Sequence, residues 1–461
     1  MTDTASADTD ALAALDPAPL IERAAELVER ARAAGATAAD AAVSRSRTRS
    51  VGVRNGRVED TDASEGDRLS LRVFVGNQVA SVAADIGAEG GGDARALAER
   101  AVAMARVSPE DPYGGLAPED RLARDWPDLD LVDGTDIPAE RLVSDAMETE
   151  AAALAVDGVT NSGGAGAYVS VGGLVLATSH GFTGAYAGTT HGRSVSVIAG
   201  EGTGMERDYD MSSRRHYADL DAAADVGRRA GERTVRRIGG RKVDTQVTNV
   251  VFEPRVARGL LGTFLSAING ASVARGTTFL RERMGERVLP AGVSVTDDPL
   301  IPRRSGSRPF DGEGVANERL TLVEDGVLRQ WLLSSALARE LDLTTNGRGR
   351  RSGSSVGAGT TNAAITPGDR TPEDLMAEMG TGLYVTEMIG RGADLVTGDY
   401  SRGASGYWIE NGEPTFPVTE VTVASTLQHM FAEMLLANDL DLSYSTAAPT
   451  IAVPGVTIAG N

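Results

Sequence analysis

Short runs of alternating apolar and polar residues, each followed by a glycine-containing turn, constrain the fold of this chain more than any other feature. Residues 51–53 alternate in this way before Asn55-Gly56, and residues 69–75 do so before Gly76-Asn77. Residues 79–82 then resume the pattern. Alternation with a period of two is typical of a β-strand, and Asn-Gly favours the type I′ turn of an antiparallel hairpin. The segment therefore predicts antiparallel strands.

Helices with one apolar face flank these strands. Residues 20–31 carry apolar side chains at helical spacing, and residues 94–107 repeat that periodicity. A second set follows, with a helix that begins near Pro138, glycine-separated strands over 159–200 and a charged helix over 220–238. Each set has the pattern of an α+β module, in which helices cover an antiparallel sheet.

The rest of the chain is richer in strands. After a buried strand at 248–252 and a helix over 254–268, the expected elements are strands at 287–295, 319–323, 328–332 and 383–389 and a helix over 425–437. Residues 346–359 are rich in glycine, serine and arginine and lack apolar periodicity. They predict a loop that is mobile or is ordered only by a ligand.

The expected fold is therefore α+β, with N-terminal and central helix-plus-antiparallel-strand modules followed by a larger strand-rich C-terminal domain. The expected boundaries are a disordered leader over 1–16, an N-terminal domain over 17–115, a central domain over 116–240 and a C-terminal domain over 241–461.

Composition excludes several classes of protein. The chain of 461 residues has no cysteine, which rules out disulfides, iron–sulfur clusters, thiolate metal sites and a cysteine nucleophile. Its formal net charge of −20 disfavours nucleic acid as a direct partner, because phosphates repel an acidic protein. The sequence has no run of about 18 apolar residues, and residues 1–14 lack the basic start of a signal peptide. We therefore expect a cytoplasmic protein without a membrane span.

The histidines and serines form no recognised catalytic motif. The four histidines are not arranged as HExxH or at any metal-ligand spacing. His180 and His191 flank glycine-rich strands and could meet, although separate surface or turn histidines are the favoured interpretation. Ser405, within Gly403-Ala404-Ser405-Gly406, is one residue short of a G-x-S-x-G elbow and lies between expected strands.

Two further clusters have both a functional and a structural interpretation. Asp311 and Glu313 are paired carboxylates that could serve acid/base chemistry or bind a hard cation, but on a glycine-flanked turn we expect them to accept backbone hydrogen bonds. Residues 347–353 form a local basic cluster. It could steer an acidic peptide, or occasionally nucleic acid, and a solvated loop is the favoured interpretation.

Several motifs resemble one protein family. Residues 397–413, TGDYSRGASGYWIENGE, look like the C-terminal hallmark of the TldD/PmbA family, whose members are also called modulators of DNA gyrase, and in particular of its TldE (PmbA) branch. Residues 307–314, 323–328 and 456–460 fit the same branch, and residues 71–76 look like the family's N-terminal module. The resemblance covers nearly the whole chain after the leader.

The resemblance implies that this chain has no metal site and no catalytic residue of its own. In the TldD branch, the helix after the strand at 250–252 carries HExxxH, and a cysteine near the C-terminus completes the metal site. Here Gly262 and Thr263 occupy the His-Glu positions, Ala267 occupies the second histidine position, and cysteine is absent. The resemblance therefore implies no cofactor in this chain and a zinc or iron ion in a TldD-like partner.

The resemblance also implies the partner and the substrate. It predicts a heterodimeric metalloprotease in which this subunit completes a cleft for unfolded or extended peptides, bound by strand addition. The gyrase label would then reflect an indirect effect. The candidate peptide-binding residues are Tyr400, Ser401, Arg402, Arg348 and Arg350.

Two alternatives remain open from the sequence. One is a stand-alone homodimer that binds peptides or acts as a scaffold. The other is an independent hydrolase with an unrecognised site, built for example on Asp311 and Glu313.

Overall fold

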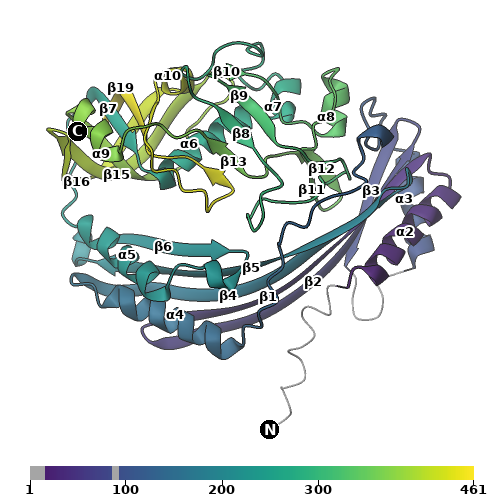
Figure 1. The fold of residues 1–461 in the computed structure, drawn as a ribbon, viewed down its shortest axis with the longest axis horizontal. Coiled ribbons are helices and arrows are strands. Elements are labelled where there is room, and N and C mark those ends of the chain that lie inside the picture. The colour runs from purple at the N-terminus through teal and green to yellow at the C-terminus, as the bar shows by residue number, and fades with distance from the viewer. Residues whose placement is uncertain (1–15, 86–92) are drawn as a thin grey trace, which may run out of the picture.

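The computed structural model describes residues 16–85 and 93–461, and it stacks the chain in two layers. A long curved sheet with its helices forms the sheet layer, residues 16–240, and a strand-rich C-terminal body, residues 241–461, lies over the concave side of that sheet (Figure 1). The expected leader lies, apart from Asp16, outside the described residues.

The sheet layer is one six-stranded antiparallel sheet of order β3-β2-β1-β4-β5-β6. Its strands are β1 (Ala38–Arg54), β2 (Arg57–Val75), β3 (Gln78–Asp85), β4 (Val159–Thr178), β5 (Thr183–Ala199) and β6 (Glu206–Arg214). Asn55 and Gly56 join β1 to β2 with φ angles of 49° and 69°, as the predicted type I′ turn requires. Because β1 pairs with β4, the segments 17–115 and 116–240 share a single sheet.

Helices cover only the convex face of this sheet. They are α2 (Ala18–Ala33), α3 (Ala94–Ala105), α4 (Ala139–Leu154) and α5 (Ala223–Arg236). Val43 of β1 and Val175 of β4 pack in the core beneath α2 and α3. Since side chains alternate along a strand, Ser44 and Leu174, which pair across β1 and β4, point to the opposite, concave face. We call this concave face, turned toward the C-terminal body, the cleft face.

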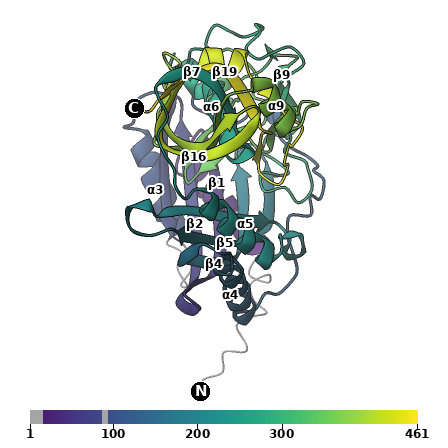
Figure 2. The same ribbon diagram turned by 90° about the vertical axis from the view of Figure 1, so that its left-hand side faces the viewer.

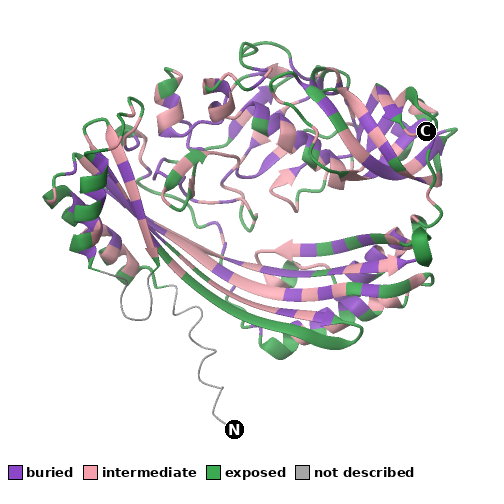
Figure 3. Cartoon of the chain, turned by 180° about the vertical axis from the view of Figure 1, so that it is seen from behind, coloured by how far each residue is buried: buried purple, intermediate pink, exposed green. Residues whose placement is uncertain are grey.

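The C-terminal body is built around a closed ring of strands. A sheet of order β16-β15-β14-β7-β19-β17 closes on itself through an additional pairing of β16 with β19. The strands are β7 (Gln246–Phe252), β14 (Gly382–Ile389), β15 (Asp399–Glu410), β16 (Glu413–Thr426), β17 (Leu435–Leu436) and β19 (Ile451–Ala459). Figure 2 shows the ring from one end, with helix α6 (Pro254–Ala267) at its centre. Buried residues gather inside this body and where the helices meet the sheet (Figure 3).

Smaller elements connect the ring to the sheet layer. A second sheet has the order β10-β9-β8-β13-β18, and β11 and β12 form a hairpin. These elements are β8 (Val295–Asp297), β9 (Leu320–Glu324), β10 (Val327–Leu328), β11 (Gly349–Ser352), β12 (Ser355–Ala358), β13 (Ala363–Ile365) and β18 (Thr446–Ala447), with helices α7 (Gly270–Ala274), α8 (Ser335–Glu340), α9 (Pro372–Met379) and α10 (Leu427–Ala432). The α+β class with a strand-rich C-terminal part is confirmed.

Four local expectations are wrong. The loop expected over 346–359 contains the hairpin β11–β12, because polar contacts rather than apolar periodicity hold this segment. The strand expected at 287–295 begins only at Val295, and the strand expected at 328–332 ends at Leu328. The helix expected over 425–437 is limited to Leu427–Ala432. Among the described residues, no helix has the length and apolar character needed to cross a membrane.

Candidate functional site

Helix α6 carries the positions at which the family resemblance places metal ligands. It begins at Pro254, directly after β7, and buries Leu260, Leu261 and Phe264 in the core of the C-terminal body. Phe264 packs edge to face against Phe431, with ring centroids 5.3 Å apart. The opposite side of the helix is open, because a Cβ atom added at Gly262 would meet no atom within 4 Å.

The residues at these positions do not fit a metal ion. Zinc in proteins is bound by imidazole, thiolate or carboxylate groups. Gly262 has no side chain, the Thr263 hydroxyl donates to the carbonyl of Gly259 at 3.0 Å, and Ala267 is fully buried. Within residues 16–85 and 93–461, no group of three or more His, Cys, Asp or Glu side chains could hold a metal ion. We therefore derive no metal-dependent step on this chain.

The histidines are placed apart from α6. His180 lies in the turn between β4 and β5, whereas His191 is buried within β5. His191 Nε2 lies 3.2 Å from Asp133 Oδ2, and His216 Nδ1 lies 4.0 Å from the other oxygen of Asp133. Burial lowers the pKa of His191 despite the opposing effect of Asp133. His191 therefore neighbours His216 rather than His180, as a neutral core residue.

Asp311 and Glu313 hold backbone amides, as the structural interpretation predicted. Asp311 Oδ1 accepts hydrogen bonds from the N–H groups of Glu313 and Val315, at 2.8 and 2.9 Å, and Oδ2 accepts one from Gly349 at 2.8 Å. Glu313 Oε2 accepts one from Ser335 at 2.7 Å. Burial, together with the adjacent charge of Glu313, raises the pKa of Asp311 to about 7. These bonds fix the loop against β11 and α8, so the two carboxylates are already engaged. A hydrolytic site built on Asp311 and Glu313 is therefore not favoured.

Ser405 also lacks the setting of a nucleophile. It lies inside β15, opposite Glu387 on β14, with 4% of its surface exposed. A nucleophile elbow requires a sharp turn between a strand and a helix, which a central strand position does not provide.

The five candidate peptide-binding residues fall into two groups on different elements. Tyr400, Ser401 and Arg402 lie in β15, where Tyr400 is buried, Ser401 is exposed and Arg402 is half-buried. Arg348 precedes β11 and is fully buried. Its Nε lies 2.5 Å from Asp297 Oδ2, and its other nitrogens donate to backbone carbonyls, so its side chain holds the base of the hairpin in place.

Arg350, by contrast, is exposed and lines a cavity of about 280 Å³ between the hairpin and the cleft face. Arg68, Arg308 and Arg351 line the same cavity, which we call the arginine cavity. Sequence reasoning marked Arg350 and missed Arg68 and Arg308, which are distant in the sequence. The alternation along β2 was the one available signal for Arg68, because it assigns this residue to the face opposite Leu69.

The cleft face itself is lined mainly by small polar residues. Ser46 of β1 pairs with Gly172 of β4, and Gly172 pairs in turn with Gly188 of β5. Two residues further along β1, the hydroxyl oxygens of Thr48 and Ser170 are hydrogen-bonded at 2.9 Å. The backbone groups of these strands are paired within the sheet, so the polar groups that this face offers are hydroxyls such as those of Ser46 and Thr48.

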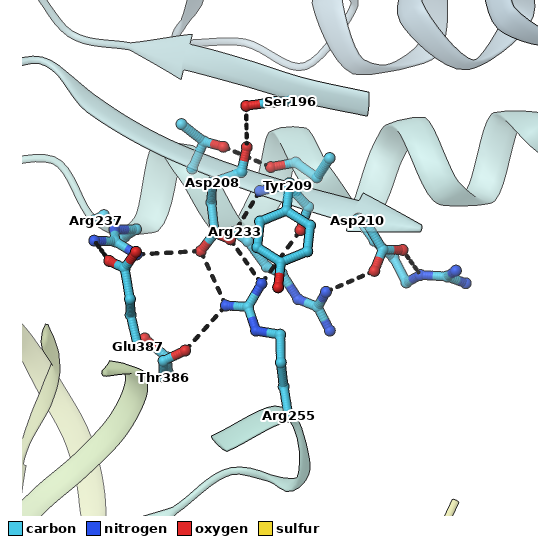
Figure 4. Close-up of polar contacts among 12 residues, drawn as sticks. Ser196, Asp208, Tyr209, Asp210, Arg233, Arg237, Arg255, Thr386 and Glu387 are labelled. Atoms are coloured by element: carbon cyan, nitrogen blue, oxygen red, sulfur yellow. Dashed lines mark hydrogen bonds and ion pairs between the residues drawn. The ribbon is translucent and has the colours of Figure 1, made fainter. Parts of the chain in front are cut away.

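An ion-pair network ties the two layers together at the other edge of the sheet (Figure 4). Asp208 of β6 accepts hydrogen bonds from Arg255 of α6, and Arg237, the residue that follows α5, pairs with both Asp208 and Glu387 of β14. Burial alone would raise the pKa of Asp208, but the hydrogen bonds and charge of Arg255 outweigh it and lower that pKa. The start of α6 is thereby fixed to the edge of the sheet.

This architecture defines a class of protein. Residues 39–105, 133–238 and 245–460 match, respectively, domain 1, the central domain and the C-terminal domain of the PmbA/TldA metallopeptidases. The chain belongs to the PmbA/TldD metallopeptidase family.

Individual relatives match over almost the whole chain. Metalloprotease PmbA of Escherichia coli O157:H7 is 36% identical over 425 residues, which cover 92% of each chain, and the PmbA homolog of Haemophilus influenzae is 34% identical over 439 residues, 94% of each. Two crystal structures share the fold at lower identity. A candidate modulator of DNA gyrase from Bacteroides thetaiotaomicron has a TM-score of 0.88 at 24% identity, covering 95% of this chain and 98% of that one. TldE from Thermococcus kodakarensis has a TM-score of 0.82 at 20% identity, covering 95% and 100%.

Proposed function

We propose that this chain is the TldE-like subunit of a two-subunit cytoplasmic metalloprotease that cleaves unfolded or extended peptides. A TldD-like partner supplies the metal, zinc or iron, and this chain completes the cleft in which the peptide lies. Family membership gives the reaction class, and the assignment to the subunit without metal is the proposal.

The observation that carries the proposal is the state of α6. The helix is present and is packed through Leu260, Leu261 and Phe264, with open space beside Gly262 and the Thr263 hydroxyl bonded to its own backbone. Its framework is therefore that of the family, while its donor atoms are not those of a metal site. A subunit that keeps the helix and lacks the ligands fits a role beside a partner that has them.

The cleft face supports the peptide part of the proposal. Its serine and threonine residues offer hydroxyl groups to an extended chain, and its glycine residues add no side chain to this face. In this proposal Arg350, Ser401 and Arg402 contact the peptide. Arg348 and Tyr400 are buried and act through the hairpin and β15 that they stabilise.

Reconstitution tests the proposal. The purified chain is assayed for cleavage of an unstructured peptide, alone and mixed with a family member that carries HExxxH, and its metal content is measured in parallel. We expect cleavage only in the mixture and no stoichiometric metal in this chain alone. Metal bound at one equivalent together with cleavage by the isolated chain would overturn the proposal. Peptide binding with an inactive mixture would instead favour the stand-alone binding protein.

The proposed contact between Arg402 and the peptide is tested in the mixture of the two subunits. Arg402→Ala should raise the KM of the reconstituted enzyme, because its guanidinium would no longer position the peptide. Arg100→Ala, at an exposed position of α3, is the matched control. Unchanged kinetics for Arg402→Ala would remove Arg402 from the site.

A further inference from the structure

The arginine cavity lies where the hairpin β11–β12 comes down onto the cleft face. Ser44, Ser70 and Leu174 of the sheet form one side, and Arg308, Arg350 and Arg351 of the C-terminal body line the other. The Ser70 hydroxyl lies 3.3 Å from the carbonyl oxygen of Gly353 and donates to it, which joins the two walls. The cavity is therefore a built feature between two contacting layers.

One of the four arginines that line this cavity has an ion-pair partner. Arg351 Nη1 lies 3.0 Å from Asp40 Oδ1, and Asp40 is also paired with Arg72. Across residues 16–85 and 93–461, the guanidinium groups of Arg68, Arg308 and Arg350 form no ion pair or hydrogen bond. This is unusual in a chain with a net charge of −20, in which acidic partners are in excess.

Several buried guanidinium nitrogen atoms that the structure describes at this cavity also lack hydrogen-bond partners. Within the described part of the chain, Arg308 Nε and Nη2 and Arg351 Nη2 are buried and form no hydrogen bond. The Arg351 side chain is only 5% exposed. Leaving a buried charged donor without an acceptor costs more free energy than leaving a neutral one, so these nitrogen atoms favour binding of an acceptor. A carboxylate matches the planar fork of a guanidinium with two parallel hydrogen bonds.

Two further carboxylates flank the cavity wall but are engaged elsewhere. Asp311 and Glu313 lie on either side of Gly312, and their oxygens accept backbone hydrogen bonds from Val315, Gly349 and Ser335. The charge of Arg308 acts on Asp311, but among the described residues neither carboxylate forms a hydrogen bond with Arg308, so an acceptor from outside the chain would complete the hydrogen bonding of this guanidinium. A long polyanion is disfavoured by the overall negative charge, whereas a single carboxylate of a peptide fits the size of the cavity.

We propose that the arginine cavity is a carboxylate-binding subsite that takes an acidic side chain or the C-terminal carboxylate of an extended peptide. This inference rests on the proposed peptide cleft and adds its charge preference. Arg308 and Arg351 would receive the carboxylate, and Arg68 and Arg350 would attract it from the cavity mouth.

Binding to the purified full chain, without a partner, tests the subsite. One labelled unstructured peptide is prepared in three forms: with an internal glutamate and an amidated C-terminus, with glutamine and a free C-terminus, and with glutamine and an amidated C-terminus. Fluorescence polarisation should show at least one carboxylate form binding about tenfold more tightly than the fully neutral form. Whichever carboxylate form binds identifies the source.

Substitutions of the cavity arginines test whether the preference for a carboxylate arises in this cavity. Arg308→Gln should abolish the preference for the carboxylate form, and Arg68→Gln combined with Arg350→Gln, both at exposed positions, should reduce it severalfold even if Arg308→Gln does not fold. Arg100→Gln, with the same loss of charge on α3, should leave it unchanged. Equal binding of the three peptides, or an equal loss in Arg100→Gln, would overturn the proposal.

The subsite and the proposed function can fail separately. A reconstituted enzyme that cleaves the neutral peptide as efficiently as the acidic forms would remove the subsite and leave the subunit role intact. Selective binding of acidic peptides by a chain that never supports cleavage would remove the subunit role and leave the subsite intact.

Discussion

Arg255, the second residue of α6, donates to both carboxylate oxygens of Asp208 on β6, at 2.7 and 3.2 Å. The same guanidinium donates to the carbonyl of Thr386 on β14 at 3.1 Å, so a single side chain joins the edge of the sheet, the helix and the ring. The helix that carries the family's metal positions is thereby held at a fixed place relative to the cleft face.

Removal of this contact should destabilise the protein. Arg255→Ala removes the closer ion-pair partner of Asp208, which is buried and also pairs with Arg237, and we expect a loss of roughly 3 kcal/mol in the free energy of unfolding. Urea denaturation measures this loss. Arg228→Ala, which breaks exposed pairs with Asp225 and Glu232 on α5, should have a much smaller effect, because solvent screens exposed ion pairs. Equal effects of the two substitutions would contradict the assignment of Arg255 as an interlayer contact.

The hairpin β11–β12 should depend on the buried pair of Arg348 and Asp297. Arg348→Met leaves Asp297 as an uncompensated buried charge, and we expect it to lower the free energy of unfolding by about 3–5 kcal/mol. Arg350→Met, two residues further along the chain at an exposed position of β11, should change it by less than about 0.5 kcal/mol. Similar stabilities of the two variants, measured in urea, would show that the pair does not hold the hairpin.

Stability should fall as the pH rises through neutrality because of Asp311. The pKa of Asp311 is raised to about 7 in the folded protein, so the folded state retains a proton that the unfolded chain releases near pH 4. The resulting stability is complete below about pH 4 and is lost as the pH rises through about 7, with a slope of at most about 1.4 kcal/mol per pH unit.

The charge of Glu313 is one cause of this shift, so Glu313→Gln should weaken the pH dependence. Unfolding in urea at two pH values, one on each side of neutrality, measures the difference for each variant. Glu59→Gln, at an exposed position of β2, controls for the change in net charge. An unchanged pH difference in Glu313→Gln would exclude the coupling between the two carboxylates.

Two helical glycines should respond oppositely to alanine. At Gly262 of α6 a Cβ atom meets nothing within 4 Å, so Gly262→Ala should stabilise the fold by about 0.4–1 kcal/mol through the higher helix propensity of alanine. At Gly227 of α5 a Cβ atom would lie 2.2 Å from the carbonyl oxygen of Thr149, and Gly227→Ala should destabilise by roughly 1–3 kcal/mol. Thermal unfolding of both variants checks the contrast. A destabilised Gly262→Ala would mean that this face of α6 is covered.

The sequence allowed prediction of those elements whose signals are local. The Asn55-Gly56 turn follows from the backbone preferences of two residues, and α6 follows from apolar spacing after Pro254. The full length of β1 and β4 was missed, because their cleft-face residues such as Ser46 and Gly172 carry no hydrophobic pattern. A strand face that packs against no core leaves no apolar alternation in the sequence.

The arginines show a second limit of the sequence. Residues 347–353 were interpreted as solvated because charged side chains are usually exposed. Arg348 is nevertheless buried, and its partner Asp297 lies far away in the sequence. The convergence of Arg68 and Arg308 on one cavity likewise depends on contacts between the layers, which no local pattern encodes.

The position of β19 determines the order in which the molecule can be completed during synthesis. This strand follows both β7 and β16 in the chain, and it lies between them and closes the ring. Until β19 has been made, β7 and β16 each present an unpaired edge. The emerging chain is therefore exposed to misassociation at these two edges at a stage when the sheet layer already has all its strands.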